Sequence, residues 1–368
     1  MKAAILTELR TPLVITEVQL PNTLEVGQAL VKIHYSGICG SQLGEIDGAK
    51  GDDKYLPHLL GHEASGTVIA TGPGVRHVKT QDKVVLHWRK GLGIEATPPS
   101  YYWDKQKVNA GWLTTFNEYA IVSENRLTTI PADSDLAVAA LFGCAVTTGF
   151  GVVLNNAKLK IGESVVVFGA GGIGLNIIQA AALVSAYPII AVDLHEERLN
   201  LAKTLGATHV INTSKANARE EIRIILGSSD LDCFIDNTGN PDIIKMGYEI
   251  TKSQGRVTLV GVPHKGKDIS IYSLPLHFGK ELRGSHGGEA EPHIDIPRYH
   301  HLFQRGLIKL KELITNYYSL DHINIAIQDM RMGKVQGRCM IEVGENRILS
   351  SLAWDSNLTQ PVEQPRQV

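Results

Sequence analysis

Hydrophobic and polar residues follow two different patterns in two parts of the chain. Up to about residue 130, short apolar runs are separated by turn sequences containing glycine and proline, and some alternate with period two, as residues 29–33 (ALVKI) do. This alternation is typical of antiparallel strands that bury one face. The first part of the chain is therefore predicted to form a barrel-like β domain.

From residue 164, continuous apolar strands alternate with segments of helical periodicity. Such an alternation is typical of a doubly wound parallel sheet with helices on both faces. We expect strands at 165–168, 189–192, 209–212, 232–237, 256–260 and 281–283, and helices at 173–186, 197–206, 218–226 and 243–252.

The composition is that of an ordinary globular protein, with 43% hydrophobic residues, 20% charged residues and a net charge of −2. This charge gives no reason to expect a nucleic-acid or membrane partner. The longest apolar stretch, 173–192, is interrupted by Asn176, Gln179 and Pro188, which favours a helix followed by a strand over a membrane span. The four cysteines are widely dispersed, which fits a reducing compartment and predicts a cytoplasmic protein.

Two cysteines and one histidine indicate a metal site. Cys39, His62 and Cys144 each lie beside a glycine in a loop-like sequence. A Cys₂His set fills three corners of a tetrahedral zinc site and leaves the fourth for water or substrate, as in catalytic rather than structural zinc sites. Taken singly, each cysteine would more simply be a small core residue, and the histidine a hydrogen-bonded structural residue.

A glycine pattern marks a dinucleotide site. The apolar strand 164–168 runs into Gly169-x-Gly171-x-x-Gly174, and an apolar helix follows. In this context Gly169 permits a tight turn, Gly171 lets the backbone approach a pyrophosphate, and Gly174 lets helix and strand pack closely. The start of the helix, at Gly172 and Ile173, then presents free N–H groups to the phosphates.

Asp193 ends the next strand, nineteen residues after Gly174. A carboxylate there binds the adenosine ribose hydroxyls and repels a 2′-phosphate, so NAD is preferred over NADP; the alternative is a helix cap. Arg198 is either a ribose or phosphate contact or an exposed helix charge. Thr238 and Val262 follow the carboxyl ends of two strands and are expected to flank the nicotinamide half.

The run GHEASGTVIATGPGV at 61–75 resembles the zinc-containing alcohol dehydrogenase signature of the medium-chain dehydrogenase/reductase family. The resemblance covers roughly residues 1–343 and implies that Cys39, His62 and Cys144 bind one catalytic zinc. It implies that Ser41 takes the proton from the alcohol, that Glu63 orients the site or exchanges onto the metal, and that Thr148 contacts the nicotinamide carboxamide region. It further implies that Arg338, in GKVQGR at 333–338, contacts the pyrophosphate.

The resemblance implies an α/β protein with a GroES-like β-barrel catalytic domain and a Rossmann domain. We predict a catalytic domain at 1–145, an NAD-binding domain at 146–288, a return to the catalytic domain at 289–343 and a poorly ordered polar tail at 344–368. A helix at 137–144 is expected to deliver Cys144, with Thr148 on the same face if the helix continues.

The loop after Cys39 departs from the family. The usual Asp is replaced by Gln42 and the usual relay His by Gly44. Protons either leave directly to water or pass through another histidine, for which His34 and His58 are candidates by nearness in sequence.

Residues 87–111 depart as well, because they contain none of the four cysteines that bind a structural zinc in many relatives. We therefore predict a single zinc per chain. The segment instead carries Trp88, Tyr101, Tyr102 and Trp103, which either hold a metal-free lobe together or stack on a sugar-like substrate or a partner. In the second case His87, Trp88 and Arg89 would supply polar contacts.

The implied activity is reversible, zinc- and NAD-dependent hydride transfer between a small alcohol or carbonyl compound and the cofactor. We expect a secondary, polyol- or sugar-like alcohol and a homodimer or homotetramer. The alternatives are a zinc-free quinone or enoyl reductase of the same fold and a non-catalytic NAD-binding protein.

Overall fold

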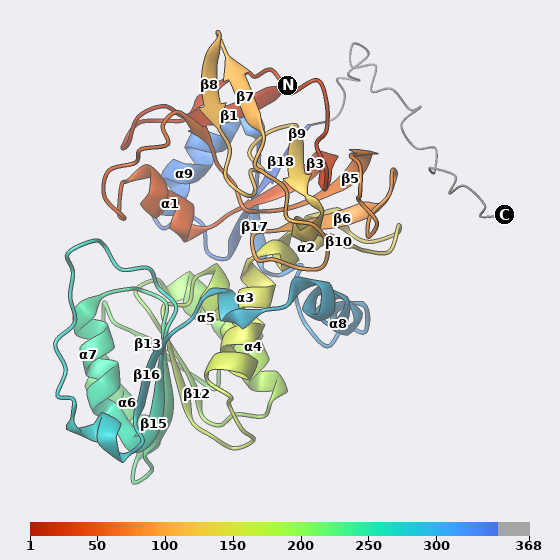
Figure 1. The fold of residues 1–368 in the computed structure, drawn as a ribbon. Coiled ribbons are helices and arrows are strands. Elements are labelled where there is room, and N and C mark those ends of the chain that lie inside the picture. The colour runs from red at the N-terminus through yellow and green to blue at the C-terminus, as the bar shows by residue number, and fades with distance from the viewer. Residues whose placement is uncertain (345–368) are drawn as a thin grey trace.

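The structure, a computed structural model, describes residues 1–344 and contains three sheets (Figure 1). The predicted tail lies outside the described residues, apart from Gly344. The strands of the two catalytic-domain sheets are β1 (Lys2–Leu6), β2 (Val14–Glu17), β3 (Gln28–Ile38), β4 (His58–Leu59), β5 (Glu63–Thr71), β6 (Lys83–His87), β7 (Ser100–Trp103), β8 (Gln106–Asn109), β9 (Tyr119–Ser123), β10 (Leu127–Thr129), β17 (Ile314–Ser319) and β18 (Arg338–Glu342).

These strands form a larger sheet in the order β10-β6-β5-β3-β18-β17, with β9 also paired to β3, and a smaller one in the order β2-β1-β4-β8-β7. The helices of this domain are α1 (Gly40–Ile46), α2 (Leu136–Ala140), α3 (Ala145–Gly151), α8 (Pro292–Gln304) and α9 (Ile323–Arg331). Ala29, Val31 and Ile33 share one core cluster, as the alternation in residues 29–33 predicted, but Leu30 on the opposite face is also buried, in a second cluster, so this part of β3 is not exposed on either face.

The second domain contains a six-stranded sheet in the order β13-β12-β11-β14-β15-β16, in which every pairing is parallel. Its strands are β11 (Val165–Phe168), β12 (Ile189–Asp193), β13 (His209–Asn212), β14 (Leu231–Asp236), β15 (Thr251–Leu259) and β16 (Glu281–Gly284), and its helices are α4 (Gly172–Leu183), α5 (Glu196–Thr204), α6 (Ala218–Leu226) and α7 (Pro241–Ile250). The predicted doubly wound sheet and the α/β fold class are confirmed.

Side chains of successive strand residues point to opposite faces, so each strand serves two cores. In β11, Val165 and Val167 pack with α4 and α5, whereas Val166 and Phe168 pack with α6 and α7. Helix α7 begins two residues earlier than predicted because the Asn240 side chain accepts the Asp242 N–H and Pro241 occupies the first helical turn.

Two segments carry the chain between the domains. Helix α3 leads into the second domain, and residues 285–291 lead back from it to α8. The two segments pack closely, because a Cβ at Gly151 would lie 2.3 Å from the Gly288 carbonyl oxygen.

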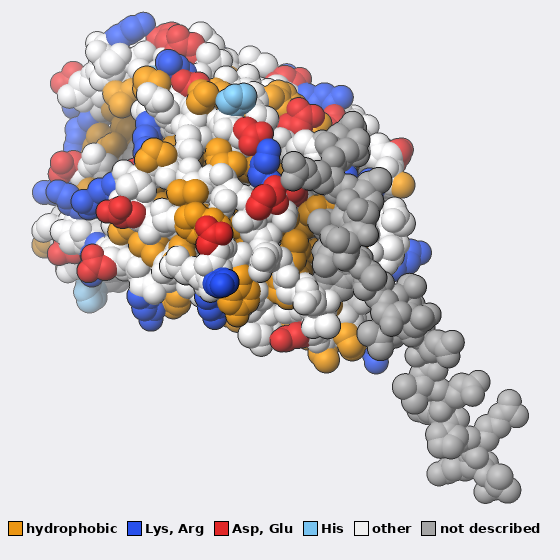
Figure 2. Space-filling model, turned by 90° about the horizontal axis from the view of Figure 1, so that it is seen from above, with side chains coloured by type: hydrophobic (Ala, Val, Ile, Leu, Met, Phe, Trp, Pro, Cys, Tyr) orange, Lys and Arg blue, Asp and Glu red, His pale blue; other side chains and the backbone are white. Residues whose placement is uncertain are grey.

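Among the described residues, no single helix is long and apolar enough to cross a membrane, although the bent pair Leu136–Gly143 and Ala145–Asn156 passes by length and composition. Nearly all of that pair is buried in the core between the domains. Acidic and basic side chains are interspersed over the face seen in Figure 2.

Candidate active site

Three distant segments bring the predicted metal ligands together. Cys39 is the N-cap of α1, His62 precedes β5, and Cys144 precedes α3. Their ligand atoms all lie within 4.8 Å of one another. Both cysteines are buried, and the buried His62 Nε2 has no hydrogen-bond partner among the described residues. An unpaired imidazole nitrogen beside two thiols fits a zinc ion.

The Cys39 and Cys144 thiols affect each other's pKa because their sulfurs are neighbours. The pKa of Cys39 is held well below its ordinary value, chiefly by a hydrogen bond from Cys144, with His62 and Arg338 adding to the effect. A thiolate is the form that binds a metal ion.

The predicted helix through 137–144 is wrong in its last turn. Helix α2 ends at Ala140, a 3₁₀ turn covers Leu141–Gly143, and Cys144 has a non-helical backbone (φ −149°, ψ −63°) before α3 begins. The close packing at this break requires glycine, because a Cβ at Gly143 would lie 2.3 Å from the Leu86 carbonyl oxygen. Helix α3 nevertheless places the Thr148 hydroxyl 3.9 Å from the Cys144 sulfur.

A buried ion pair lies directly behind the metal set. Glu63 is fully buried and pairs with Arg338, which is 3% exposed. The second Glu63 oxygen accepts the Ala145 N–H at 3.1 Å. The Arg338 stem also covers the start of α4, where a Cβ at Gly172 would lie 2.2 Å from Arg338 Cδ. One arginine thus connects the metal set with the glycine turn.

The loop after Cys39 lies within α1. Ser41 is partly buried there, and Gln42, in place of the family's Asp, accepts the Cys39 N–H at 2.8 Å. His34 lies within hydrogen-bonding distance (2.8 Å) of the Thr67 hydroxyl, and His58 within 2.8 Å of the Asp53 carboxylate.

Neither histidine has a hydrogen bond to Ser41 in the described part of the chain. Burial, followed by the charges of Lys83 and Lys32, lowers the pKa of His34 to about 4. His34 is therefore a weak base at neutral pH.

The glycine turn has the geometry that its sequence predicted. Gly169 has φ +93°, and a Cβ at Gly174 would lie 2.0 Å from the Gly169 carbonyl oxygen. A Cβ at Gly171 would meet nothing within 4 Å, so the turn is open where a ligand would approach. Ile173 follows in the first turn of α4.

The other predicted cofactor residues lie around this turn. The two Asp193 oxygens accept the Ala170 and His195 N–H groups, and Arg198 lies 3.9 Å from the same carboxylate while donating to the Val335 carbonyl. The Thr238 hydroxyl donates to buried Asp236, and its methyl carbon lies beside Gly169. Val262 is 52% exposed.

The segment after β6 contains residues whose roles the sequence did not reveal. Buried His87 lies within hydrogen-bonding distance of the Thr128 hydroxyl and the Arg89 carbonyl, and burial lowers its pKa to about 4, so it is a structural group. Trp88 lies beside Cys144, where it acts to lower the pKa of the thiol, which neighbouring Cys39 and burial together raise well above its ordinary value. Tyr101 is fully buried, and its hydroxyl oxygen accepts the Ile121 N–H.

A buried carboxylate joins the start of this segment to the turn before β6. Glu124 is 1% exposed and accepts the backbone N–H groups of Arg76, His77 and Ile94. Glu124 lies far in sequence from all three donor residues, which hid this role.

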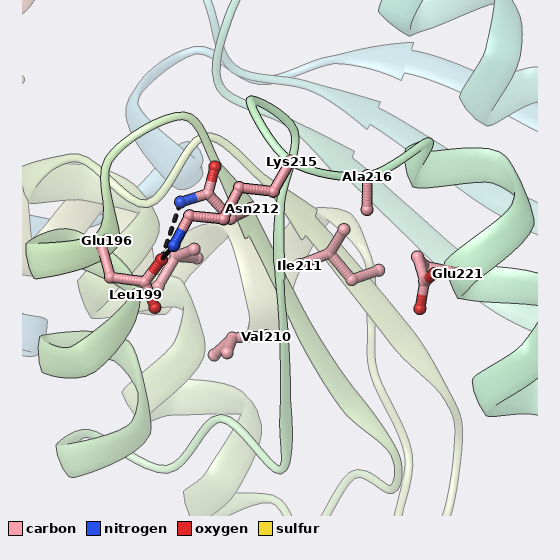
Figure 3. A pocket seen from close by; sticks show the side chains of 8 residues that line it. All are labelled: Glu196, Leu199, Val210, Ile211, Asn212, Lys215, Ala216 and Glu221. Atoms are coloured by element: carbon pink, nitrogen blue, oxygen red, sulfur yellow. Dashed lines mark hydrogen bonds and ion pairs between the residues drawn. The ribbon is translucent and has the colours of Figure 1, made fainter.

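A hollow of about 290 Å³ lies away from the metal set, between α5 and the sheet edge at β13 (Figure 3). Glu196 on its wall accepts hydrogen bonds from Asn212 and Lys215. Because these charged groups already satisfy each other, the hollow does not compete with the glycine turn as a cofactor site.

Comparison with known proteins gives two family matches. Residues 25–132 match the alcohol dehydrogenase GroES-like domain, and residues 172–305 match the zinc-binding dehydrogenase domain. The chain is 30% identical to an S-(hydroxymethyl)glutathione dehydrogenase of Paracoccus denitrificans over 376 residues, covering 90% of this chain and 97% of that protein.

Two solved structures are similar over nearly their whole length. One is an alcohol dehydrogenase zinc-binding domain protein from Burkholderia ambifaria (27% identity, TM-score 0.85, 94% of this chain and 99% of that one). The other is a benzyl alcohol dehydrogenase from Acinetobacter calcoaceticus (28% identity, TM-score 0.83, 93% and 99%).

Proposed function

Because the chain belongs to the zinc-dependent alcohol dehydrogenases of the medium-chain dehydrogenase/reductase family, we propose that Cys39, His62 and Cys144 form its catalytic zinc site. The clustering of these three ligand atoms is the observation that carries the proposal. The protein is an oxidoreductase that acts on CH–OH donors with zinc and NAD. When bound by these residues, zinc would supply a Lewis acid that lowers the pKa of the alcohol, and NAD would supply a hydride acceptor.

The residues near the glycine turn fit a bound dinucleotide. Arg338 has a buried Nε without a hydrogen-bond partner in the described chain, close to Gly172 and the free N–H groups of α4. A pyrophosphate can accept hydrogen bonds from the Arg338 Nε and from the free N–H groups of α4. We assign the ribose to Asp193, with Arg198 beside it, and the nicotinamide end to Thr148, Thr238 and Val262.

Ser41 is the proposed proton acceptor for the alcohol, and Glu63 a positioning group behind His62. Since Gly44 replaces the usual relay histidine and neither His34 nor His58 is bonded to Ser41, the proton leaves through water. A solvent deuterium isotope effect that stays the same in His34→Gln and in His58→Gln supports this route. A tenfold loss of kcat in either variant contradicts it.

The polyol- or sugar-like substrate stays a prediction. This prediction came from the aromatic side chains of the segment 87–111. In the structure, however, Tyr101 and His87 of this segment are buried and make structural hydrogen bonds. The names of the relatives add S-(hydroxymethyl)glutathione and benzyl alcohol as test substrates. A panel of these two with sorbitol and 2,3-butanediol, ranked by kcat/KM, identifies the class.

We also propose a homodimer formed through the edge of the six-stranded sheet. Strand β16 is an edge strand, and the segment before it exposes Tyr272, Leu274, Leu276 and Phe278, of which Tyr272 is 72% and Phe278 67% exposed. Two β16 strands related by a two-fold axis can pair and cover these apolar side chains. Sedimentation of a dimer that Phe278→Asp converts to monomer supports this proposal, and a wild-type monomer contradicts it.

Zinc content per chain tests the site. We expect about one zinc in the wild type, none in Cys144→Ala, and one in Cys233→Ala, which removes a buried cysteine outside the set. Two zincs would contradict the single-site assignment. No zinc would favour a zinc-free reductase, and no turnover with zinc bound would favour a non-catalytic NAD-binding protein. The cytoplasmic location stays a prediction from the four free cysteines.

A further inference from the structure

Trp88 lies beside the metal set. It follows β6, whose antiparallel register pairs His87 with Glu63, so Trp88 lies across from His62. Its side chain lies beside the Cys144 thiol, and its indole is only partly buried against the catalytic-domain core. The indole therefore forms a wall of the space next to the metal ligands.

A loop from the returning chain covers the other side of this indole. The His286 ring meets Trp88 edge-on, with 4.9 Å between ring centroids and an interplanar angle of 82°. A Cβ at Gly287 would lie 2.4 Å from Trp88 Cζ2, so only glycine permits this contact. Gly287, Gly288 and Glu289 all have positive φ, at +65°, +67° and +46°. Glycine adopts positive φ without strain, but Glu289 needs contacts that hold it in this conformation.

Arg89 supplies those contacts from the catalytic domain. Its Nε donates to the Ala290 carbonyl at 3.0 Å, and its Nη1 donates to the His286 carbonyl at 2.5 Å, at the two ends of the loop. The same Nη1 lies 2.8 Å from His286 Nδ1. The guanidinium also lies over the Trp88 ring, 5.9 Å from its centroid. Arg89 thus closes the loop onto Trp88 with charge-assisted hydrogen bonds.

We propose that Arg89 is a positioning residue of the alcohol site: it holds the loop 286–290 on Trp88 and so fixes the indole against the zinc ligand Cys144. This inference rests on the proposed function in one respect, because it takes the space beside Trp88 and the metal ligands to be the alcohol site. Without Arg89 the loop lifts, the indole gains rotational freedom, and bulky alcohols lose a fixed surface on which to orient.

The first test does not depend on activity. Acrylamide quenching of tryptophan fluorescence is measured for the wild type and Trp88→Phe, and the difference reports Trp88; the same pair is measured with Arg89→Ala. We expect Trp88 to become roughly three times more quenchable in the Arg89→Ala background, since its cover is lost. The control Arg219→Ala removes an exposed ion pair with Glu249 and leaves quenching unchanged. Equal quenching of Trp88 with and without Arg89 overturns the proposal.

The second test separates positioning from a general loss of fold. In Arg89→Ala we expect KM for benzyl alcohol to rise about tenfold, while kcat for ethanol stays within about threefold, because misorientation affects the larger substrate more. Zinc content stays at the wild-type value, and Arg89→Lys recovers part of the loss through the two carbonyl contacts.

In a Trp88→Ala background, Arg89→Ala should change the benzyl-to-ethanol ratio no further, since the indole that it positions is gone. If Arg89→Ala changes the benzyl-to-ethanol ratio by the same factor in the wild type and in Trp88→Ala, Arg89 does not act through Trp88. If the zinc-loaded wild type oxidises no alcohol, the proposed function fails, and the quenching test still decides whether Arg89 holds Trp88.

Discussion

Glu124 is predicted to replace a structural metal in holding residues 76–94 to the catalytic domain. Its carboxylate accepts N–H groups from Arg76 at 2.5 Å, His77 at 2.6 Å and Ile94 at 3.0 Å. Burial alone would raise the pKa of Glu124, but these three backbone hydrogen bonds outweigh it and hold the pKa below its ordinary value. The carboxylate is therefore ionised where it anchors the segment.

The substitution Glu124→Gln keeps one oxygen for Arg76 and His77 but turns an amide NH₂ toward the Ile94 N–H. One charge-assisted hydrogen bond, worth about 1.5–3 kcal/mol, is lost, and a buried donor is left unpaired. We expect about 2–3 kcal/mol of destabilisation, which lowers the melting temperature of a domain of this size by roughly 4–12 °C. Glu124→Ala removes both acceptor oxygens, and with them all three hydrogen bonds, and is expected to cost about 4 kcal/mol.

Thermal melting and limited proteolysis measure this effect, with exposed Glu312→Gln as the control. Cleavage within 76–100 should accelerate in Glu124→Gln and stay slow in the control. Because the folded pKa lies below the unfolded one, the contribution is present above the unfolded pKa and is lost as pH falls through the folded value, so wild type and Glu124→Gln should converge only below the folded pKa. Equal melting at pH 7 would refute the reasoning, as would a chelator that loosens the segment to the same extent as the substitution.

Two further substitutions test the charged groups around the cofactor turn. Replacing Asp193 by Ser should raise KM for NAD about tenfold and lower KM for NADP, since the 2′-phosphate no longer meets a carboxylate; unchanged selectivity in steady-state kinetics would contradict the assignment. Glu63→Ala should cost about 3–5 kcal/mol in urea unfolding because it leaves Arg338 buried and unpaired, whereas Glu63→Leu combined with Arg338→Met should recover most of that loss. A double variant as unstable as Glu63→Ala would show that the buried charge is not the cause.

The sequence correctly predicted those helices, strands and turns that are determined by neighbouring residues. The apolar run before Gly169 and the spacing of Gly171 and Gly174 predicted a strand, a tight turn and a helix, and β11 and α4 confirm all three. The helix through Cys144 was predicted wrongly: it breaks after Ala140, beside Gly143, which packs against Leu86 and Glu63, and these residues are distant in sequence.

The sequence by itself determined the fold class and the glycine turn, because each depends on residue type and spacing along the chain, and it predicted the three metal ligands from the short motif around each one. Only the tertiary structure decided which partners the buried charges have. Glu63 meets Arg338, Glu124 meets three backbone N–H groups, and Arg89 meets the loop 286–290. A buried charge must find a partner wherever the packed chain provides one. Periodicity along the sequence therefore could not identify these partners.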